Sequence, residues 1–245
     1  MIKGINNKPY LSLDSYIDIE EFKEMHEALC AGLAKSNRVQ GSYGNGALKQ
    51  SQHLDLWEAR LRYFSLPESH PIRVNGRAVE NNHAHLKFYL KLAYAPNTSV
   101  YLRSELKHIR KAFAEDCRWE ANAEHFPKLI PLIKKLPFKS LGRIIFFLHE
   151  HESEMLIHSD ICEEQRYDPH RNEFIWIRSR LDKNFFIYDP ESKEKKQVTS
   201  YAAFFNEHDF HGGDPTPQMT FSLRIDGFFT EEFREKIGIA HIDHY

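Results

Sequence analysis

A succession of short apolar runs after residue 141 constrains the fold most strongly. Each run is rich in β-branched and aromatic residues and is bounded by polar turn residues, which is the pattern of β-strands. The runs cover residues 143–148, 155–158, 174–178, 184–188, 197–199 and 219–225. A parallel α/β fold would need a helix between each pair of strands, and the intervals do not supply one. The pattern therefore predicts a jelly-roll or barrel-like antiparallel sheet.

The first half of the chain has a mainly helical pattern. Residues 18–33 carry apolar side chains at spacings of three and four, and Asp14 or Asp18 can cap the start of this helix. Helical patterns return over 83–93 and 100–117. No stretch forces a domain boundary. We therefore expect a single α+β domain over 1–245, in which residues 1–140 supply mainly helical support and part of the sheet.

Charge and hydropathy exclude several classes of partner. The chain has 33 basic and 35 acidic residues, so its net charge of −2 gives no general attraction to nucleic acid or to an anionic membrane. The apolar run at 144–148 is far shorter than the roughly 20 residues of a membrane span. The N-terminus lacks the pattern of a secretory signal, and three widely spaced cysteines fit reduced thiols. We expect a cytoplasmic protein without a nucleic-acid or membrane partner.

The 15 histidines raise the question of a metal site. Two histidines and one carboxylate on one face of an iron ion leave the other positions open, and a His-x-Asp or His-x-Glu pair on a strand presents two of these ligands on the same side. With 35 acidic residues among 245 positions, chance alone predicts about two such pairs, and three His-x-Asp pairs occur. The bare motif therefore carries no information, and only its context does.

Context separates the three pairs. His53-Leu-Asp55 runs into a helical pattern, where residues two apart point nearly opposite ways. His241-Ile-Asp243 lies at the end of the sequence and has a single histidine after it. His158-Ser-Asp160 ends a predicted strand and has further histidines downstream, followed by another predicted strand. Only this third pair has a complete setting for a metal site.

The residues that follow this pair complete a known pattern. His211 comes 53 positions after His158, and Arg224 comes 13 positions after His211, whereas His208 lies 16 positions before Arg224. Over residues 143–229 the chain resembles the Fe(II)/2-oxoglutarate-dependent dioxygenases, in which His-x-Asp, a distal His and an Arg occur in this order. The resemblance implies that His158, Asp160 and His211 hold Fe(II), with His208 as the alternative distal ligand.

The resemblance also implies a fold, a reaction and a cosubstrate site. The fold is a double-stranded β-helix of the jelly-roll or cupin-like type over 141–230, with the helices packed outside. The reaction uses Fe(II), 2-oxoglutarate and O2 to hydroxylate an unactivated C–H bond and releases succinate and CO2, with no catalytic residue beyond the metal ligands. Arg224 would bind the distal carboxylate of 2-oxoglutarate with two parallel hydrogen bonds, and Ser222 on the same strand face could donate to it.

A finer resemblance concerns the substrate. Residues 205–213 and 221–229 look similar to small stand-alone enzymes that act on free amino acids, including lysine hydroxylases and their halogenase relatives. The halogenases have Gly or Ala where this chain has Asp160, so hydroxylation is the implied outcome. A free amino acid, with lysine or another cationic one first, is the expected small-molecule substrate. The substrate candidates are Arg143, Tyr167, Trp176 and Asp226.

Several alternatives stay open at this point. The target could instead be a protein or peptide side chain or another small metabolite, and the chain could also be a non-catalytic β-barrel binding module. Zinc hydrolysis is more remote, because no glutamate base occurs at a recognised spacing. Asp226 could pair with Arg224, Trp176 could belong to the core, and Ser159, Asp209 or Asp214 could support the metal ligands. The oligomeric state has no sequence indicator.

Overall fold

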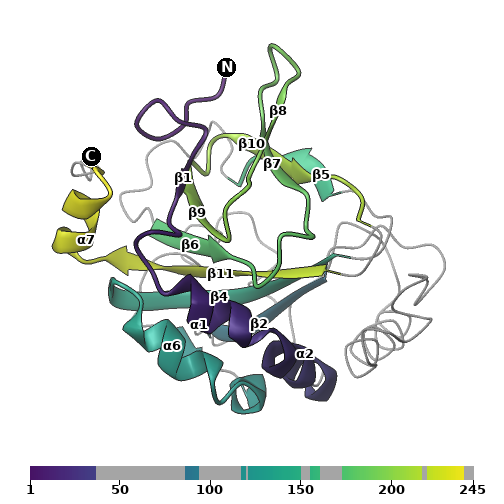
Figure 1. Cartoon of the computed structure of the whole chain (residues 1–245), viewed down its shortest axis with the longest axis vertical. Coiled ribbons are helices and arrows are strands. Elements are labelled where there is room, and N and C mark those ends of the chain that lie inside the picture. The colour runs from purple at the N-terminus through teal and green to yellow at the C-terminus, as the bar shows by residue number, and fades with distance from the viewer. Residues whose placement is uncertain are drawn as a thin grey trace.

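The computed structural model describes residues 1–36, 86–93, 117–119, 121–149, 155–160, 173–216 and 220–239. These residues form two antiparallel sheets with helices on one side (Figure 1). The pairs His53/Asp55 and His241/Asp243 and the substrate candidate Tyr167 lie outside the described residues, as does nearly all of the predicted helix 100–117.

The two sheets have different sizes. The larger one has the strand order β1-β9-β6-β11-β4-β2-β3, and the smaller one has the order β5-β10-β7-β8. The strands are β1 Tyr10–Ser12, β2 Leu86–Ala93, β3 Cys117–Trp119, β4 Phe138–His149, β5 Met155–His158, β6 Glu173–Ile177, β7 Phe185–Tyr188, β8 Lys195–Gln197, β9 Ala202–Phe205, β10 Phe210–Gly213 and β11 Thr220–Phe229.

The strand order identifies a jelly roll. From β4 to β11 the chain passes back and forth between the sheets, placing β4, β6, β9 and β11 in the larger sheet and β5, β7, β8 and β10 in the smaller one. Every pairing within this set is antiparallel. The predicted double-stranded β-helix core in an α+β chain is confirmed by this topology.

The central strands β4 and β11 separate two environments. Their pairing aligns Phe221 with Leu148 and Arg224 with Ile145. On one face of the sheet, the rings of Phe221 and Phe146 pack on each other and on residues of the helical layer. The opposite face of β11 carries Ser222, Arg224 and Asp226, which are buried between the two sheets. Period-two alternation thus gives β11 an apolar outer face and an inner face that carries these three polar side chains.

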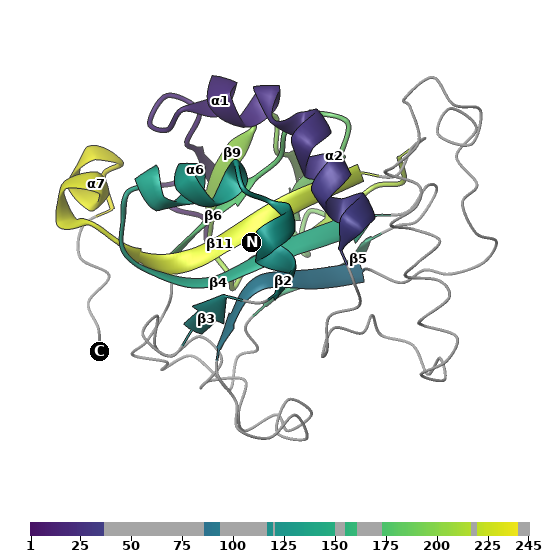
Figure 2. The ribbon, with the colours of Figure 1, turned by 90° about the horizontal axis from the view of Figure 1, so that it is seen from below.

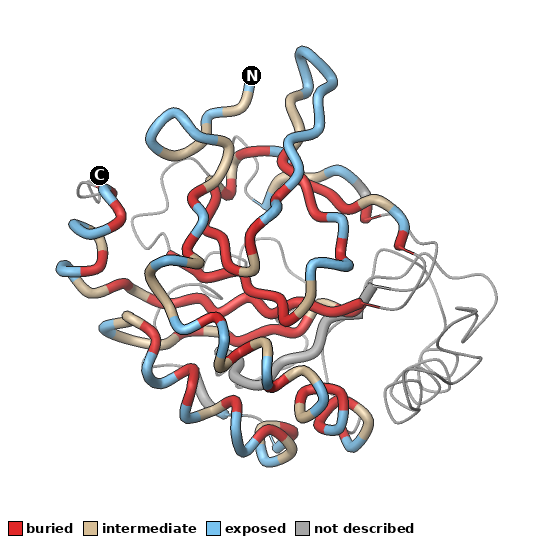
Figure 3. The backbone as a smooth tube through the Cα atoms, in the orientation of Figure 1, coloured by how far each residue is buried: buried red, intermediate tan, exposed pale blue. Residues whose placement is uncertain are grey.

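The helices cover the outer face of the larger sheet. They are α1 Ile19–Glu24, α2 His26–Lys35, the 3-10 helix η4 Ala121–His125, and α6 Leu129–Lys135, with α7 Glu231–Lys236 following β11. Figure 2 shows α1, α2 and α6 side by side on this face. Asp18 caps α1 by accepting a hydrogen bond from the backbone N–H of Glu21, as expected. Buried segments run through the sheets and the inward sides of the helices (Figure 3).

Three expectations about elements need correction. Residues 83–93 are predicted as helix, but Leu86–Ala93 form β2, which pairs with the long strand β4; tertiary pairing here overrides a helical reading of local sequence. The helix predicted over 18–33 is two helices that meet at Met25. The strands β9 and β10 have no counterpart among the predicted runs. Within the described part of the chain, no helix is long and apolar enough to cross a membrane.

Candidate metal centre

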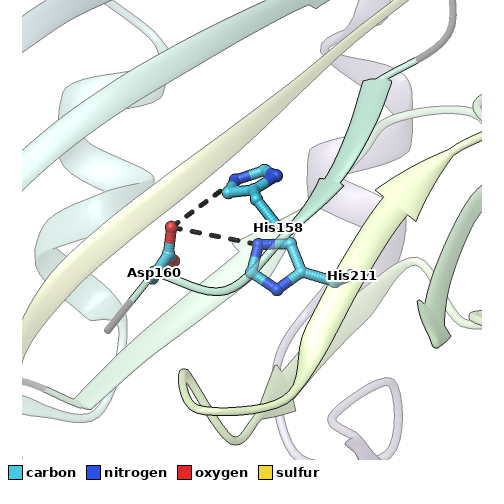
Figure 4. A group of neighbouring side chains, drawn as sticks. All are labelled: His158, Asp160 and His211. Atoms are coloured by element: carbon cyan, nitrogen blue, oxygen red, sulfur yellow. Dashed lines mark ion pairs between the residues drawn. The ribbon is translucent and has the colours of Figure 1, made fainter. Parts of the chain in front are cut away.

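Two histidines lie opposite each other on adjacent strands of the smaller sheet. His158 ends β5 and His211 lies in β10, and the two residues are direct partners in the antiparallel register. Direct partners project their side chains from the same face of a sheet, and the two imidazole ring centroids lie 4.6 Å apart. Asp160 follows His158 by two residues and turns its carboxylate toward both rings (Figure 4).

The three side chains offer one compact set of ligand atoms. The Oδ1 atom of Asp160 lies 3.8 Å from Nε2 of His158 and 3.9 Å from Nε2 of His211. One ligand atom from each residue lies within 4.8 Å of the others, a separation at which a single ion can reach all three. The backbone N–H of Asp160 donates to the carbonyl of Glu207 at 3.1 Å, which ties the end of this segment to the loop before β10.

The protonation of His211 suits metal binding. Its Nδ1 lies 3.0 Å from the backbone carbonyl of Asp209, which can only accept, so Nδ1 carries the hydrogen and Nε2 presents its lone pair. Burial lowers the pKa of His211, and the Asp160 carboxylate opposes this effect only in part. The ring also packs against Phe185 and Phe205, with centroids 5.7 and 5.1 Å away. A neutral, fixed imidazole is therefore held at this position.

The structure brings His211, and not His208, together with His158 and Asp160. His208 is half-buried in the preceding loop, where its backbone N–H donates to the side chain of Asn206. Of the residues that the sequence suggested as supports for the metal ligands, Asp209 contacts Nδ1 of His211 through its backbone carbonyl. The side chain of Asp214 instead pairs with Lys195 and Gln197.

Arg224 pairs with Asp226, as the sequence allowed, and with two further carboxylates that the sequence did not indicate. It is 4% exposed, and its guanidinium donates to Asp226 Oδ1 at 2.6 Å, to Asp160 Oδ2 at 2.5 Å and to Glu207 Oε1. The ring of Phe174 covers its face at 3.9 Å. Burial acts to lower the pKa of Arg224, but the carboxylates of Asp226, Glu207 and Asp160 overcome it and raise the pKa well above its ordinary value.

Asp226 and Trp176 take structural positions. The carboxylate of Asp226 is fully buried and accepts from Arg224 and from Arg143, whose Nε and Nη2 lie 2.7 and 2.6 Å from Oδ2. Asp226 thus pairs with arginines, which is the structural alternative considered above. Trp176 is buried and stacks on Phe185 with ring centroids 4.7 Å apart, as expected of a core residue.

A buried lysine that was not among the residues singled out from the sequence lies beside Ser222. Lys183 is 2% exposed, and its Nζ donates to Oγ of Ser222 at 2.7 Å. Among the described residues no carboxylate forms an ion pair with Nζ; the rings of Phe147 and Trp176 lie 5.9 Å away. Burial, assisted by the charge of Arg178, lowers the pKa of Lys183 well below its ordinary value. In sequence this lysine is one residue of a polar turn, which gives no sign of burial.

The loop around Lys183 is itself held in place. Arg178, at the end of β6, donates to the backbone carbonyls of Lys183, Val198 and Ser200. Its guanidinium therefore fixes the turn from which the Lys183 side chain enters the barrel. A charged group pointed into an apolar interior with one neutral partner is costly unless an anion joins it.

The donor groups fit an iron ion and a dicarboxylate. Two imidazoles and one carboxylate form the ligand set typical of non-haem Fe(II), with positions left for other ligands. Lys183 and Ser222 offer an ammonium and a hydroxyl, which suit a carboxylate. Ser222 and Arg224 share one face of β11 and are two residues, about 7 Å, apart, so the lysine lies on the same interior wall as the guanidinium that contacts Asp160.

Comparisons with known proteins do not assign the chain to a family. No family model and no curated protein matches it. A viral collagen prolyl hydroxylase from Paramecium bursaria Chlorella virus-1, solved with 2-oxoglutarate, is 9% identical, with 44% of this chain and 75% of that chain covered and a TM-score of 0.30. A Pseudomonas putida prolyl-4-hydroxylase is 9% identical over 60% of this chain and 73% of that chain, with a TM-score of 0.31.

A third solved structure, an RmlC-like cupin from Shewanella frigidimarina, is 15% identical over 38% of this chain and 78% of that chain, with a TM-score of 0.23. Likenesses at these scores carry no argument about activity. The strand order of the chain itself defines the jelly roll, and its own side chains form the candidate metal centre.

Proposed function

We propose that this protein is an Fe(II)- and 2-oxoglutarate-dependent dioxygenase that hydroxylates an unactivated C–H bond. The observation that carries the proposal is the convergence of His158, Asp160 and His211 within 4.8 Å inside a jelly roll. These three residues would hold Fe(II). When bound, the ion and 2-oxoglutarate supply the oxidation of C–H to C–OH by O2, with succinate and CO2 as co-products.

Lys183 and Ser222 are the proposed anchor for the distal carboxylate of 2-oxoglutarate. The resemblance assigns this role to Arg224, but that guanidinium already binds three carboxylates. Lys183 is a buried amine whose described hydrogen-bond partner is a neutral hydroxyl, so a bound carboxylate would pair with it as an ammonium. Ser222 would also donate to the distal carboxylate, as the resemblance implies. Its hydroxyl accepts from Nζ of Lys183 and can donate to the same anion.

Aromatic side chains give this interior a low polarity. Phe174, Phe205, Phe185 and Trp176 form a continuous series of ring contacts that reaches His211. All four are buried. Such packing excludes water from one side of the proposed centre and strengthens the charge interactions of Lys183 and Asp160.

The substrate proposal is a free amino acid, with lysine or another cationic amino acid first, and it rests on the sequence resemblance. Of the substrate candidates, Asp226 is held by Arg143 and Arg224, and Trp176 is part of the core. The alternative substrates are a protein or peptide side chain and another small metabolite. A screen of free amino acids against peptides tests the first of these alternatives.

The test is an anaerobic titration with Fe(II) and 2-oxoglutarate, followed by optical absorption of the charge-transfer band. We expect the band in the wild-type protein and its loss in His158→Ala and His211→Ala, because each variant removes one ligand of the triad. His208→Ala is the matched control, since His208 lies outside the triad, and it should retain the band. A wild-type protein that binds no divalent metal would refute the proposal.

Substrate class is tested by succinate release in air. Free amino acids form one set, led by lysine and arginine, and unstructured peptides with the same side chains form the other. Release above the substrate-free rate with a free amino acid, and none with the peptides, supports the first candidate. The reverse result assigns a peptide substrate. Metal binding without stimulated release by any compound in either set would exclude both of these substrate classes and leave another small metabolite or the binding module.

A further inference from the structure

We propose that Arg224 is a positioning residue, which orients the carboxylate of Asp160 so that one chosen oxygen faces the metal. This inference rests on the proposed function, because it assigns Asp160 as a metal ligand. Arg224 would touch neither the ion nor a substrate. It would act through Asp160 alone, and would therefore have a different role from the cosubstrate anchor that the sequence resemblance implies.

The two oxygens of Asp160 have different neighbours. Oδ2 accepts from Nη1 of Arg224 at 2.5 Å. Oδ1 lies 3.8 Å from Nε2 of His158 and 3.9 Å from Nε2 of His211. The guanidinium thus occupies one oxygen and leaves the other directed at the two histidines. Asp160 would consequently present a single oxygen to the ion, which leaves more positions open for other ligands.

Arg224 is itself fixed on three sides, as a positioning group must be. Its Nε donates to Asp226, which Arg143 also holds, and its Nη2 donates to Glu207. Glu207 also accepts the backbone N–H of Asp160 through its own carbonyl. Glu207 therefore holds the backbone of Asp160, and Arg224 holds its side chain. Arg224 and Glu207 are also hydrogen-bonded to each other.

The guanidinium also connects the two sheets. Arg224 lies in β11, in the middle of the larger sheet, where it pairs with residues of both β4 and β6. Asp160 follows the end of β5, an edge strand of the smaller sheet. The most enclosed strand of the barrel thus sets the position of a ligand that follows a strand at the edge of the other sheet.

Positioning and simple charge make opposite predictions for a neutral variant. The cluster Arg143, Arg224, Asp160, Glu207 and Asp226 contains two cations and three carboxylates. If Arg224 acted only as a charge, its removal would make the cluster more negative and strengthen the attraction of a divalent ion. If it orients Asp160, its removal releases the carboxylate and weakens metal binding.

The experiment measures Mn(II) affinity by electron paramagnetic resonance in the absence of 2-oxoglutarate, so that no turnover is involved. We expect Arg224→Gln and Arg224→Lys each to weaken Mn(II) binding by about 10- to 100-fold. Lysine keeps the charge but is a point donor that cannot make three divergent hydrogen bonds. The control is Arg234→Lys, which disturbs a comparable arginine–carboxylate pair with Glu173, outside the cluster, and should leave affinity unchanged.

The outcomes separate the two proposals. A wild-type protein that fails to bind Mn(II) refutes the dioxygenase assignment itself. If Arg224→Gln has unchanged circular dichroism and binds Mn(II) at least as tightly as the wild type, positioning is refuted. The proposal of a metal centre then still stands. Equal losses in Arg224→Lys and Arg234→Lys would also count against positioning, since a general loss of packing would then explain both.

A second variant keeps the inference testable if the Arg224 variants do not fold. Asp160→Glu retains the carboxylate and leaves Arg224 in place, at a side chain that is 26% exposed. A fixed guanidinium would hold the longer side chain out of line with the histidines, so we expect a loss of Mn(II) affinity close to that of Asp160→Asn. Wild-type affinity in Asp160→Glu would mean that the carboxylate finds the ion unaided, contrary to the inference.

Discussion

At the scale of single residues, Lys183 carries the strongest conflict between stability and function. Its ammonium is buried with a hydroxyl partner, and burial lowers its pKa well below the ordinary value. Such a group costs folding free energy in either protonation state at neutral pH, because the folded protein must bury a charge or release a proton. Residues that destabilise a fold in this way are typical of binding sites.

Replacing Lys183 should therefore stabilise the protein and impair cosubstrate binding. We expect Lys183→Met to raise the free energy of unfolding at neutral pH by about 1–2 kcal/mol, because it removes the buried amine at nearly equal volume. The same variant should bind 2-oxoglutarate at least tenfold more weakly. Urea denaturation and cosubstrate titration measure the two effects, and a destabilised variant with normal 2-oxoglutarate affinity would contradict the assignment.

The depressed pKa of Lys183 also fixes the direction of a pH effect. The unfolded chain keeps this proton to higher pH than the folded one, so wild-type stability rises with pH from the lowered folded pKa up to the ordinary value of a lysine. The stability gain in Lys183→Met should shrink across the same range. Because a bound carboxylate favours the ammonium, 2-oxoglutarate affinity should fall as pH rises in the wild type. Denaturation and titration at several pH values check both trends.

At the scale of elements, β10 and β5 place the two histidines opposite each other. Gly212 follows His211, and a Cβ atom there would lie 2.8 Å from the Phe186 ring and 3.1 Å from the Met155 carbonyl. The position therefore requires a glycine for the close approach of β5 and β7 to β10.

Gly212→Ala should push these strands apart. We expect a loss of stability of about 1–3 kcal/mol, the usual cost of overpacking, together with weaker metal binding because His158 and His211 lose their register. Urea denaturation and Mn(II) titration measure the two quantities. Gly142→Ala is the comparison, since its nearest contact would be 3.2 Å, and it should cost less.

The elements also mark how far the sequence can be interpreted. Strand β5 and the pair His158 and Asp160 were predictable from a His-x-Asp motif at a strand end, whereas His211 came from the spacing of the family resemblance. Strand β10 was not predictable, since its Phe-His-Gly-Gly sequence lacks strand propensity and forms by pairing on both sides with β5 and β7. The pairing of Arg224 with Asp160 and Glu207 and the burial of Lys183 depend on contacts between distant segments, which no local pattern encodes.

At the scale of the whole molecule, the two faces of the larger sheet carry different side chains. The outer face buries apolar side chains under α1, α2 and α6, and this layer contributes to one continuous hydrophobic cluster with the sheet. The interior face carries Ser222, Arg224 and Asp226 in a polar row. The same hydrophobic cluster also includes Phe174, Trp176 and Phe185, so aromatic rings and charged groups share the barrel interior.

The direct opposition of His158 and His211 across β5 and β10 has a mechanical consequence. An ion held by both would act as a removable crosslink between segments 53 residues apart in the chain. Because the unfolded chain cannot keep the three ligands together, Mn(II) at one hundred times its dissociation constant should add about 2.7 kcal/mol to the free energy of unfolding. Thermal unfolding with and without chelator would measure this gain, which His211→Ala should abolish. The metal would thus stabilise the smaller sheet in addition to its proposed part in the reaction.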